Sequence, residues 1–458
     1  MSEIKVNKIS PRTNCGTVQL GDSGDTITIP AGATITNNGT QTGFGRTGTV
    51  DWQTSIKTSG FAAVSGEGYF CNTTSGGFTV TLPSSPSAGD IVAVSDYAST
   101  FDTGSCTLGR NGSNIEGDAS DLVINIEGAA ITVVYADATK GWIVVNSGNS
   151  TDARLEPKFV TATGGCISTV CTNFKVHTFN SPGTFTVTCA GNAAGSNTVS
   201  YIVVAGGGGG GDGRGGGGGA GGFREGLGLN DSYTGSPLRS PTGVPVTATD
   251  FPITVGAGGA GASSPDCDGN NGNNSVFSTI TAAAGGKGGG VNPSASVKAG
   301  GPGGSGGGAG GTFCSSSAQP GGPGNTPPVS PPQGNNGGNG VSNGPPNVPG
   351  GFSHGATGGG AGGAGSPATG TPATGAGGVG VSTSIAGSPV AYAGGGGGAS
   401  DNGATGGSPC GTGGCGQTSS TPAKNGATNT GGGGGGLKVA QGGGSGGSGR
   451  VIIRYKFQ

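Results

Sequence analysis

The sequence predicts an all-β chain with a polyglycine-II helical bundle, organised as a β stem, a β-sandwich domain and a glycine-rich distal domain in a homotrimer. The first observation is a short apolar strand that runs directly into polyglycine, as at 201–205 before 206–211 and at 390–393 before 394–398. The second is composition, since glycine supplies 112 of the 458 residues. The third is that no segment of useful length has the periodicity of an amphipathic helix.

Composition alone also fits a disordered chain, because glycine and proline together make up about 30% of the residues. Disordered segments usually carry high net charge, however, whereas charged residues are 9% of this chain and its net charge is −2. A collagen triple helix is excluded because glycine does not recur at every third position. A flexible linker has no reason to return repeatedly to a strand, so we expect packed glycine segments.

Residues 1–48 are predicted to form a β stem that attaches the chain to a larger assembly. Segments 26–29 and 33–36 alternate between polar and apolar residues, with a turn at 30–32 between them. Such a short piece has too few apolar residues for a core of its own, since even domains of about 60 residues are marginal. Three identical copies would supply the missing surface, which predicts a thin trimeric stem.

Residues 49–150 are predicted to form a β-sandwich domain. Turn signals such as Arg110-Asn111-Gly112 separate short apolar segments, a pattern typical of sandwiches and barrels. Trp52 and Trp142 both lie here, and we expect both in the hydrophobic core. The predicted strands lie at 78–82, 91–94, 122–126, 131–135 and 142–145.

Residues 151–200 are predicted to form a β connector that contains a hairpin. Segments 175–179 and 184–188 are strand-like and flank Asn180-Ser181-Pro182-Gly183. Proline followed by glycine sets the dihedral angles that a tight turn needs. We therefore expect these two strands to pair with each other.

Residues 201–458 are predicted to form the polyglycine-II domain. A helix of this type has three residues per turn, rises about 3.1 Å per residue and contains no internal hydrogen bonds. Every N–H and C=O group must then find a partner on another segment, and glycine allows the close approach that this requires. Asp212-Gly213-Arg214 is predicted to form a turn between two glycine runs. If strands mark the base, richer segments emerge at the opposite end as a recognition surface, namely 223–250, 263–275, 312–349 and 399–430.

The sequence does not favour a secreted, membrane-inserted or nucleic-acid-binding protein. The N-terminal residues lack the apolar core of a signal peptide, and no segment reaches the roughly 18 apolar residues of a membrane span. We therefore expect folding in a cytosol and mostly free thiols. Cys166 and Cys171, or Cys410 and Cys415, are close enough in sequence to bridge after release. The net charge of −2 gives no electrostatic case for nucleic acid.

No catalytic residue, metal ion or cofactor is predicted. His177 and His354 are the only histidines, so neither a Ser-His-Asp arrangement nor a zinc site can be assembled from them. We expect His177 to be packed in a strand, and His354 to be a tip contact or an exposed bystander. Residues 266–270 resemble a calcium loop, but Phe277 stands where that loop requires a glutamate.

Several motifs resemble bacteriophage fibre proteins. Residues 171–222 and 431–455 resemble the glycine-rich domain of tailed-bacteriophage tail fibres, through the motifs at 177–187, 203–206 and 446–455. The architecture is similar to that of the tail-fibre tip adhesins of T-even-like phages. In those adhesins polyglycine-II helices pack in layers, and the loops between them bind host surface receptors.

The resemblance implies a virion structural protein, a receptor-binding tail fibre made in the host cytoplasm. Its partners would be copies of itself in a homotrimer, another virion tail or fibre protein bound through the N-terminal segment, and a bacterial surface polysaccharide or outer-membrane protein. Residues 7–12 and 27–33 resemble fibre stems of phages that infect marine cyanobacteria. One departure is that T-even-like adhesins are separate tip proteins, whereas stem, β domain and tip share this chain.

Aromatic and charged residues between the glycine runs are the candidate receptor contacts. Aromatic rings stack on sugars or fill receptor grooves, and arginine holds anionic groups through two parallel hydrogen bonds. The alternative for each residue is that it only caps the glycine segments. The candidates are Asp231, Tyr233, Arg239, Phe313, His354, Asp401 and Lys424.

Two other functions stay open on the sequence. One is a tail spike that cleaves polysaccharide, which needs two carboxylates roughly 5–9.5 Å apart. The acidic residues available in 201–458 are Asp212, Glu225, Asp231, Asp250, Asp266, Asp268 and Asp401. The other is a structural tail or capsid appendage that contacts no receptor. An ice-binding protein is disfavoured because the repeat is irregular and a signal sequence is missing.

Overall fold

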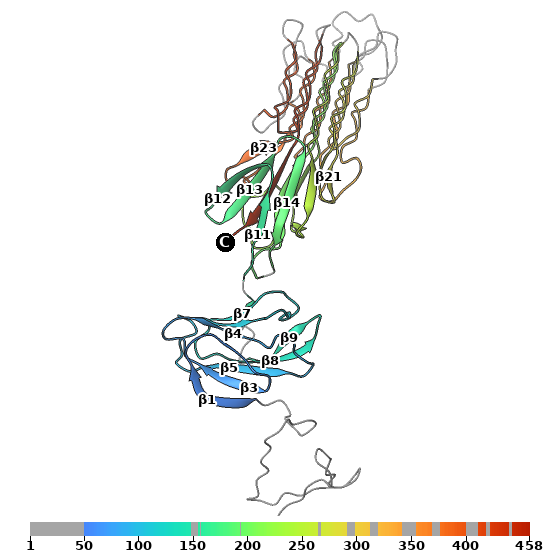
Figure 1. Ribbon diagram of the computed structural model, residues 1–458. Coiled ribbons are helices and arrows are strands. Elements are labelled where there is room, and N and C mark those ends of the chain that lie inside the picture. The colour runs from blue at the N-terminus through green and yellow to red at the C-terminus, as the bar shows by residue number, and fades with distance from the viewer. Residues whose placement is uncertain are drawn as a thin grey trace, which may run out of the picture.

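The computed structural model describes residues 50–147, 154–155, 157–192, 194–263, 267–290, 298–311, 319–340, 354–368, 376–399, 411–417, 422–438 and 442–458. Within these ranges every regular element is a β-strand and none is a helix, so the predicted all-β class is confirmed. The strands gather in two bodies that lie end to end, and glycine segments extend away from the sheets of the second body (Figure 1). The predicted stem, 1–48, lies outside the described residues.

The first body, within 50–155, is a β-sandwich of two five-stranded sheets. The first sheet has the order β1 (Asp51–Lys57), β3 (Glu67–Cys71), β5 (Ile91–Asp96), β8 (Ala130–Asp137) and β9 (Gly141–Ser147). The second has the order β10 (Arg154–Leu155), β7 (Leu122–Ile124), β6 (Cys106–Gly109), β4 (Phe78–Thr81) and β2 (Phe61–Ala62). From β1 to β6 the chain alternates between the sheets, so β1, β3 and β5 pair in parallel, as do β2, β4 and β6.

The five strands predicted in the sandwich are all present, as β4, β5, β7, β8 and β9. Trp142 is fully buried, as expected, and meets Tyr135 edge to face at a centroid distance of 5.6 Å. The expectation for Trp52 was wrong, because this residue is 41% exposed. β1 is an edge strand, and its Trp52 ring stacks at 4.8 Å on Phe70, on the face of β3 opposite the buried Tyr69.

The second body, within 157–458, contains three sheets. One has the order β11 (Val160–Thr163), β14 (Gly183–Ala190), β19 (Asp250–Thr254), β20 (Ser275–Phe277) and β21 (Ile280–Ala282). The largest has the order β12 (Cys166–Val170), β13 (Phe174–Phe179), β24 (Arg450–Lys456), β15 (Thr198–Val204), β16 (Phe223–Gly226) and β17 (Arg239–Ser240), with β18 (Val244–Pro245) also on β15. The third pairs β22 (Val381–Thr383) with β23 (Val390–Tyr392).

The predicted transition from strand to glycine is confirmed. β15 leads into the glycine run at 206–211, β21 leads into 285–290, and β23 leads into 394–399. β24 follows the last glycine segment and pairs antiparallel with β15, with Val203 opposite Val451. The beginning and the end of the glycine-rich sequence therefore meet in the centre of one sheet.

The predicted hairpin at 175–188 was wrong, although both of its strands form. β13 pairs with β12 and β24, whereas β14 pairs with β11 and β19. Both edges of each strand are thus occupied by other strands, and the turn at Pro182-Gly183 carries the chain from one sheet to the next. Phe179 and Phe185, on either side of this turn, are buried in one shared core cluster.

The glycine segments are joined laterally by backbone hydrogen bonds that repeat every three residues. Along 206–211, each N–H group donates at 2.8–3.0 Å to a different neighbouring segment in rotation. The partners lie in 267–273 for Gly206 and Gly209, in 442–449 for Gly207 and Gly210, and in 215–222 for Gly208 and Gly211. The acceptor number falls by three at each repeat, so these three neighbours run antiparallel to 206–211.

The carbonyl groups of 206–211 follow the same rotation with three further segments. They accept at 2.8–3.0 Å from 285–288 at Gly206 and Gly209, from 259–262 at Gly207 and Gly210, and from 434–437 at Gly208 and Gly211. Every backbone group of this segment is therefore paired, with three parallel and three antiparallel neighbours. The backbone itself fills the core here, because a Cβ atom on Gly208 would overlap the carbonyl oxygen of Gly286.

Candidate functional site

The glycine segments reach a common end, away from the sheets, which the sequence predicts as the recognition surface. The predicted turn at 212–214 is present there, with Gly213 and Arg214 at φ of 69° and 65°. Backbone hydrogen bonds set three other segments level with this turn: Arg214 N–H donates to Lys438, Gly311 N–H to Arg214, and Ala399 N–H to Gly215. Residues from four segments that are far apart in the sequence therefore lie side by side at this distal end.

The placement of segment 223–250 at the distal end was wrong. This segment contains β16, β17 and β18 and begins β19, so it lies among the sheets at the opposite end. Its strands β16 and β18 pair with β15, which precedes the first glycine run, and β17 pairs with β16. Three of the seven candidate contacts, Asp231, Tyr233 and Arg239, lie in this segment and accordingly beside the sheet.

Asp231 is part of a buried ion pair. Its carboxylate Oδ1 lies 3.0 Å from Nε of Arg454 on β24, and the two side chains are 2% and 1% exposed. The Ser200 hydroxyl donates to Oδ2 at 2.6 Å. Burial raises the pKa of Asp231, although the Ser200 hydroxyl and the Arg454 charge act in the opposite direction. The geometry gives Asp231 a structural role in holding the 227–238 loop on the sheet.

Tyr233 and Arg239 complete this buried cluster. The guanidinium of Arg454 lies between two rings, 4.3 Å from the centroid of Phe174 and 5.2 Å from that of Tyr233. Arg239 donates from Nη1 to the Tyr233 carbonyl at 2.8 Å, and its guanidinium lies 5.6 Å from the Tyr233 ring centroid. Burial also raises the pKa of Tyr233. These contacts account for both residues without an external ligand.

The other four candidates have different environments. Lys424 is exposed, and its backbone N–H donates to the Cys415 carbonyl at 3.1 Å. His354 is 1% exposed, so the expectation of an exposed bystander was wrong. Phe313 and Asp401 lie outside the described residues. Within the described part of the chain, Lys424 is thus the one candidate with an exposed side chain in a glycine segment.

Three of the acidic side chains that the sequence offers for catalysis, Asp231, Glu225 and Asp268, are engaged in local contacts. Glu225 accepts from the Thr383 hydroxyl at 2.6 Å and from the Ser236 N–H at 2.8 Å. Asp268 pairs with Lys287 at 2.8 Å and Lys298 at 3.6 Å. Burial disfavours ionisation of Asp268, but a Gly290 N–H and the two lysines outweigh it and hold its pKa below the ordinary value.

A family comparison matches the part of the chain that contains the hydrogen-bonded glycine segments. The model of the glycine-rich domain covers residues 179–456. The chain belongs to the glycine-rich domain family. The matched region begins at the end of β13 and ends with β24. These two strands pair with each other in the largest sheet. No curated protein matches the sequence at a significant level.

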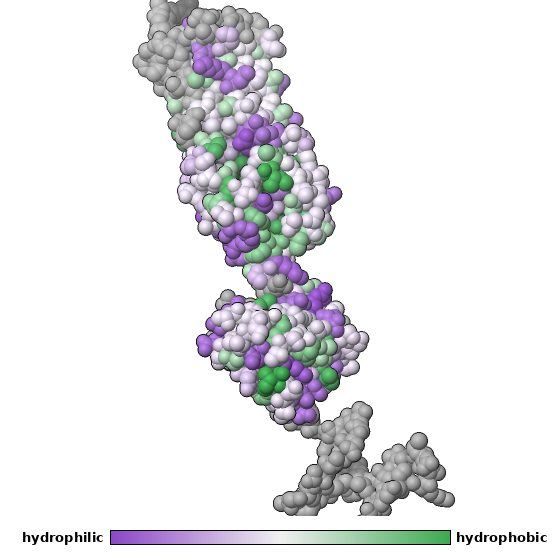
Figure 2. All heavy atoms as spheres, turned by 60° about the vertical axis from the view of Figure 1, so that its left-hand side comes forward, coloured by the Kyte–Doolittle hydropathy of each residue, from purple (hydrophilic) through white to green (hydrophobic). Residues whose placement is uncertain are grey.

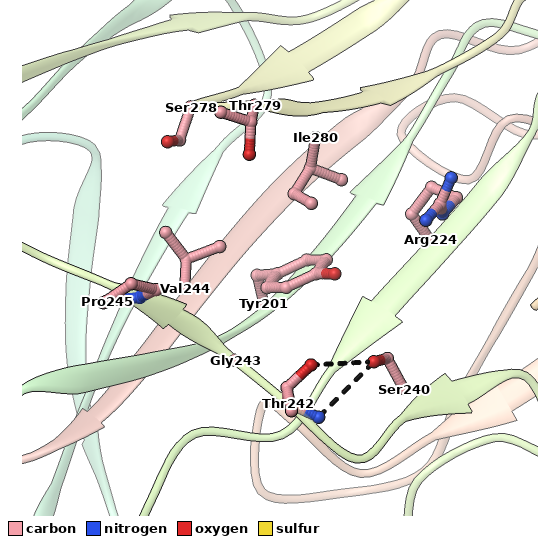
Figure 3. A pocket seen from close by; sticks show the side chains of 10 residues that line it. All are labelled: Tyr201, Arg224, Ser240, Thr242, Gly243, Val244, Pro245, Ser278, Thr279 and Ile280. Atoms are coloured by element: carbon pink, nitrogen blue, oxygen red, sulfur yellow. Dashed lines mark hydrogen bonds between the residues drawn. The ribbon is translucent and has the colours of Figure 1, made fainter. Parts of the chain in front are cut away.

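The glycine-rich domain also contains a surface pocket that the sequence does not predict. Its volume is about 370 Å³, and Figure 3 shows Tyr201 at its centre, between Ser240 and Thr242 on one side and Ile280 on the other. Arg224 lies at one end. The pocket lies between β16, β17 and β18 and the turn from β20 to β21, and its remaining lining residues are Gly243, Val244, Pro245, Ser278 and Thr279. The residues that line the pocket lie up to 79 positions apart, so no local sequence motif predicts it.

His177 is packed in β13, as the sequence predicts. It is fully buried, with Nδ1 2.7 Å from the Gly164 carbonyl oxygen and Nε2 3.0 Å from the Tyr455 hydroxyl. Burial lowers the pKa of His177. Among the described residues, no three His, Cys, Asp or Glu side chains form a group that could hold a metal ion.

The cysteines that the structure describes are free thiols. Cys166 begins β12 and Cys171 directly follows its last residue, so at about 3.3 Å per residue their Cα atoms are roughly 16 Å apart, beyond the approximately 7 Å limit for a disulfide. The expectation that these two could bridge was therefore wrong. Cys410 lies outside the described residues.

In the described ranges, no helix is long and apolar enough to cross a membrane. Exposed large apolar side chains are dispersed, with Tyr97 and Val145 on the sandwich and Ile167, Leu229 and Val379 on the second body. On the face that Figure 2 shows, apolar surface accordingly occurs in small separate areas among polar residues.

Proposed function

We propose that the glycine segments are polyglycine-II helices and that they form a rigid scaffold. The supporting observation is the three-residue rotation of hydrogen bonds along 206–211 and the same pattern along 215–222. A helix with three residues per turn directs successive N–H groups 120° apart, which is what three different partners in rotation require. Since glycine loses more backbone entropy than any other residue on folding, this dense hydrogen bonding is needed to hold the segments in place.

We propose that the protein is a tail fibre of a tailed bacteriophage, made in the host cytoplasm, that recognises and attaches to the host cell. The observation that carries this proposal is the arrangement of the glycine-rich domain, in which a stiff, backbone-hydrogen-bonded body brings several chain segments to one distal end. Loops on a rigid scaffold are the usual form of a recognition surface. The fibre-like motifs at 177–187 and 446–455 support the same proposal.

The mechanism that we propose is attachment through distal loops whose supports do not rearrange. A rigid support limits the conformational entropy lost on binding, so contacts by a few side chains suffice. The candidate contacts are Phe313, Asp401 and Lys424, while His354 is buried and Asp231, Tyr233 and Arg239 have structural partners beside the sheet. The receptor would be a bacterial surface polysaccharide or outer-membrane protein.

The assembly that we propose is a homotrimer, held together by the stem at 1–48 and attached through it to another virion tail or fibre protein. Catalysis forms no part of the proposal. A polysaccharide-cleaving spike would release new reducing ends from host polysaccharide, and a purely structural appendage would not bind cells. Both alternatives are therefore separable from attachment by direct assay.

The test has two parts. Antibodies raised against the full chain should label the fibres of the phage particle in electron micrographs, and label on the capsid or on no particle would contradict the proposal. Purified full-length protein should bind to some strains in a panel of cyanobacterial and other Gram-negative cells. Phe313→Ala and Asp401→Asn should reduce that binding, whereas the matched change Lys57→Gln on the sandwich should not. Failure of the wild-type protein to bind any strain that the phage infects would also overturn it.

A further inference from the structure

The pocket around Tyr201 contains polar groups that have no hydrogen-bond partner among the described residues. The guanidinium of Arg224 and the hydroxyl of Tyr201 make no hydrogen bond or ion pair with any described residue. Ser240 and Thr242 hydroxyls lie 3.2 Å apart and each keeps further hydrogen-bonding capacity. Unpaired donors that converge in one concave place are what a polar ligand site requires.

The pocket carries a positive charge. Arg224 is the one charged residue in its lining. The adjacent Glu225 does not neutralise it, because successive residues of a strand point to opposite faces and Glu225 is held on the other face by Thr383 and Ser236. Burial raises the pKa of the Tyr201 hydroxyl; the Arg224 charge opposes this rise, and the Glu225 charge adds to it. An anionic group is therefore the favoured occupant near Arg224.

The floor of the pocket is rigid and partly apolar. Tyr201 is 3% exposed and its ring meets Phe277 edge to face at 6.3 Å. Gly226 lies over the ring, and a Cβ atom at this position would stand 2.5 Å from Cε1 of Tyr201. Val244 and Ile280 add apolar surface beside the ring. A ligand here meets an aromatic and aliphatic floor with hydroxyl groups and one guanidinium at the rim.

We propose that this pocket binds a sugar residue that carries a carboxylate. Arg224 would hold the carboxylate through two parallel hydrogen bonds, which the planar guanidinium favours. The Ser240, Thr242 and Thr279 hydroxyls would bond to ring hydroxyl groups, and Tyr201 would contact the apolar face of the sugar. A volume of about 370 Å³ lies in the range of small-molecule sites. This inference rests on the proposed function, since acidic sugars occur in bacterial surface polysaccharides, and it adds a second binding site beside the sheets.

The experiment is a ligand-detected NMR titration of the full-length protein with sodium glucuronate. Glucuronate should bind saturably, and glucose should bind much more weakly because it lacks the anionic group. Arg224→Gln should weaken glucuronate binding at least about tenfold, the loss expected for a charged hydrogen-bonding partner. The matched control is Lys140→Gln, which removes the same charge from an exposed position on the sandwich, outside the pocket, and should leave binding unchanged.

A titration with inorganic phosphate distinguishes a pocket that binds any anion from a pocket that binds an acidic sugar. No saturable glucuronate binding by the wild-type protein, an unchanged affinity in Arg224→Gln, or phosphate binding as tight as glucuronate would each overturn the proposal. Unchanged amide hydrogen exchange in β15 and β16 would show that Arg224→Gln is folded. If it is not, Thr242→Val replaces it, with weaker glucuronate binding expected and wild-type affinity contradicting the proposal.

The outcome is separable from the proposed function. If the wild-type protein attaches to cells but does not bind glucuronate, only the proposed pocket ligand is wrong. If the protein binds glucuronate through Arg224 but attaches to no strain that the phage infects, only the proposed fibre function is wrong.

Discussion

Replacing Gly208 by alanine tests whether lateral backbone packing stabilises the glycine-rich domain. A Cβ at this position would overlap the carbonyl oxygen of Gly286 and lie 3.0 Å from that of Gly285. Restoring an ordinary contact requires the two segments to separate by about 1 Å. That movement would stretch the bonds from Gly219 N–H to Gly286 and from Gly285 N–H to Gly206, both now 2.8 Å, beyond hydrogen-bonding range.

The expected loss of stability follows from those two bonds. Each buried hydrogen bond left unmade costs about 1–3 kcal/mol. Alanine restricts the unfolded chain, which offsets about 0.4–1 kcal/mol. The net destabilisation is then about 1–6 kcal/mol, which corresponds to a fall of roughly 2–20 °C in the melting temperature of a domain of this size.

The assay is thermal unfolding with two probes. Circular dichroism follows the whole chain, whereas tryptophan fluorescence follows only the sandwich, because Trp52 and Trp142 are the only tryptophans. Gly208→Ala should lower the transition of the glycine-rich domain and leave the fluorescence transition unchanged. The control Gly363→Ala should have little effect, since its Cβ would meet a methyl group of Val379, a side chain that is 42% exposed and can move.

Two results would refute this reasoning. One is a Gly208→Ala protein that is as stable as the wild type. The other is rapid amide hydrogen exchange along 206–222 in the wild type, at the rate of an unstructured peptide, because hydrogen-bonded N–H groups exchange slowly.

Asp231→Ala should destabilise the glycine-rich domain by about 3–5 kcal/mol in chemical denaturation, since it leaves the Arg454 charge buried without a partner, and a loss below about 1 kcal/mol would contradict this. Because burial lowers the pKa of His177, the unfolded chain binds its proton more readily, so stability should fall as pH decreases below about 6.5, and His177→Gln should flatten that dependence. Iodoacetamide should label the exposed Cys166 rapidly but Cys106 only after unfolding, since Cys106 is buried and its thiol pKa is raised by a hydrogen bond that it donates to Cys71 and by burial; equal labelling rates in mass spectrometry would refute it.

Local sequence patterns predicted most strands of this protein. The alternation at 131–135 and the apolar run at 201–205 mark β8 and β15, because strand formation depends on side chains within a few residues. The turn at 212–214 was also predictable, since glycine adopts positive φ without strain. The strand β2 was missed because its two residues are too few to show a period.

The pairing of these elements was not predictable from local patterns. The turn at Pro182-Gly183 has the chemistry of a hairpin, yet β13 and β14 have other partners on both edges. Likewise, Asp231 and Tyr233 have the chemistry of binding residues, but Arg454, more than 220 positions away, engages both. Contacts between distant residues leave no mark in either local sequence.

The amino-acid sequence by itself thus determined the all-β class, the transitions from strand to glycine and the need for partners outside each glycine segment. A chain of glycine has no side chains to encode which segment lies beside which. The tertiary structure alone decided that 206–211 lies among six other segments. It also decided that β15 and β24 pair in the centre of the sheet from which these segments extend. The physical reason is that backbone hydrogen bonds are the same at every residue, so their partners are selected by the fold as a whole.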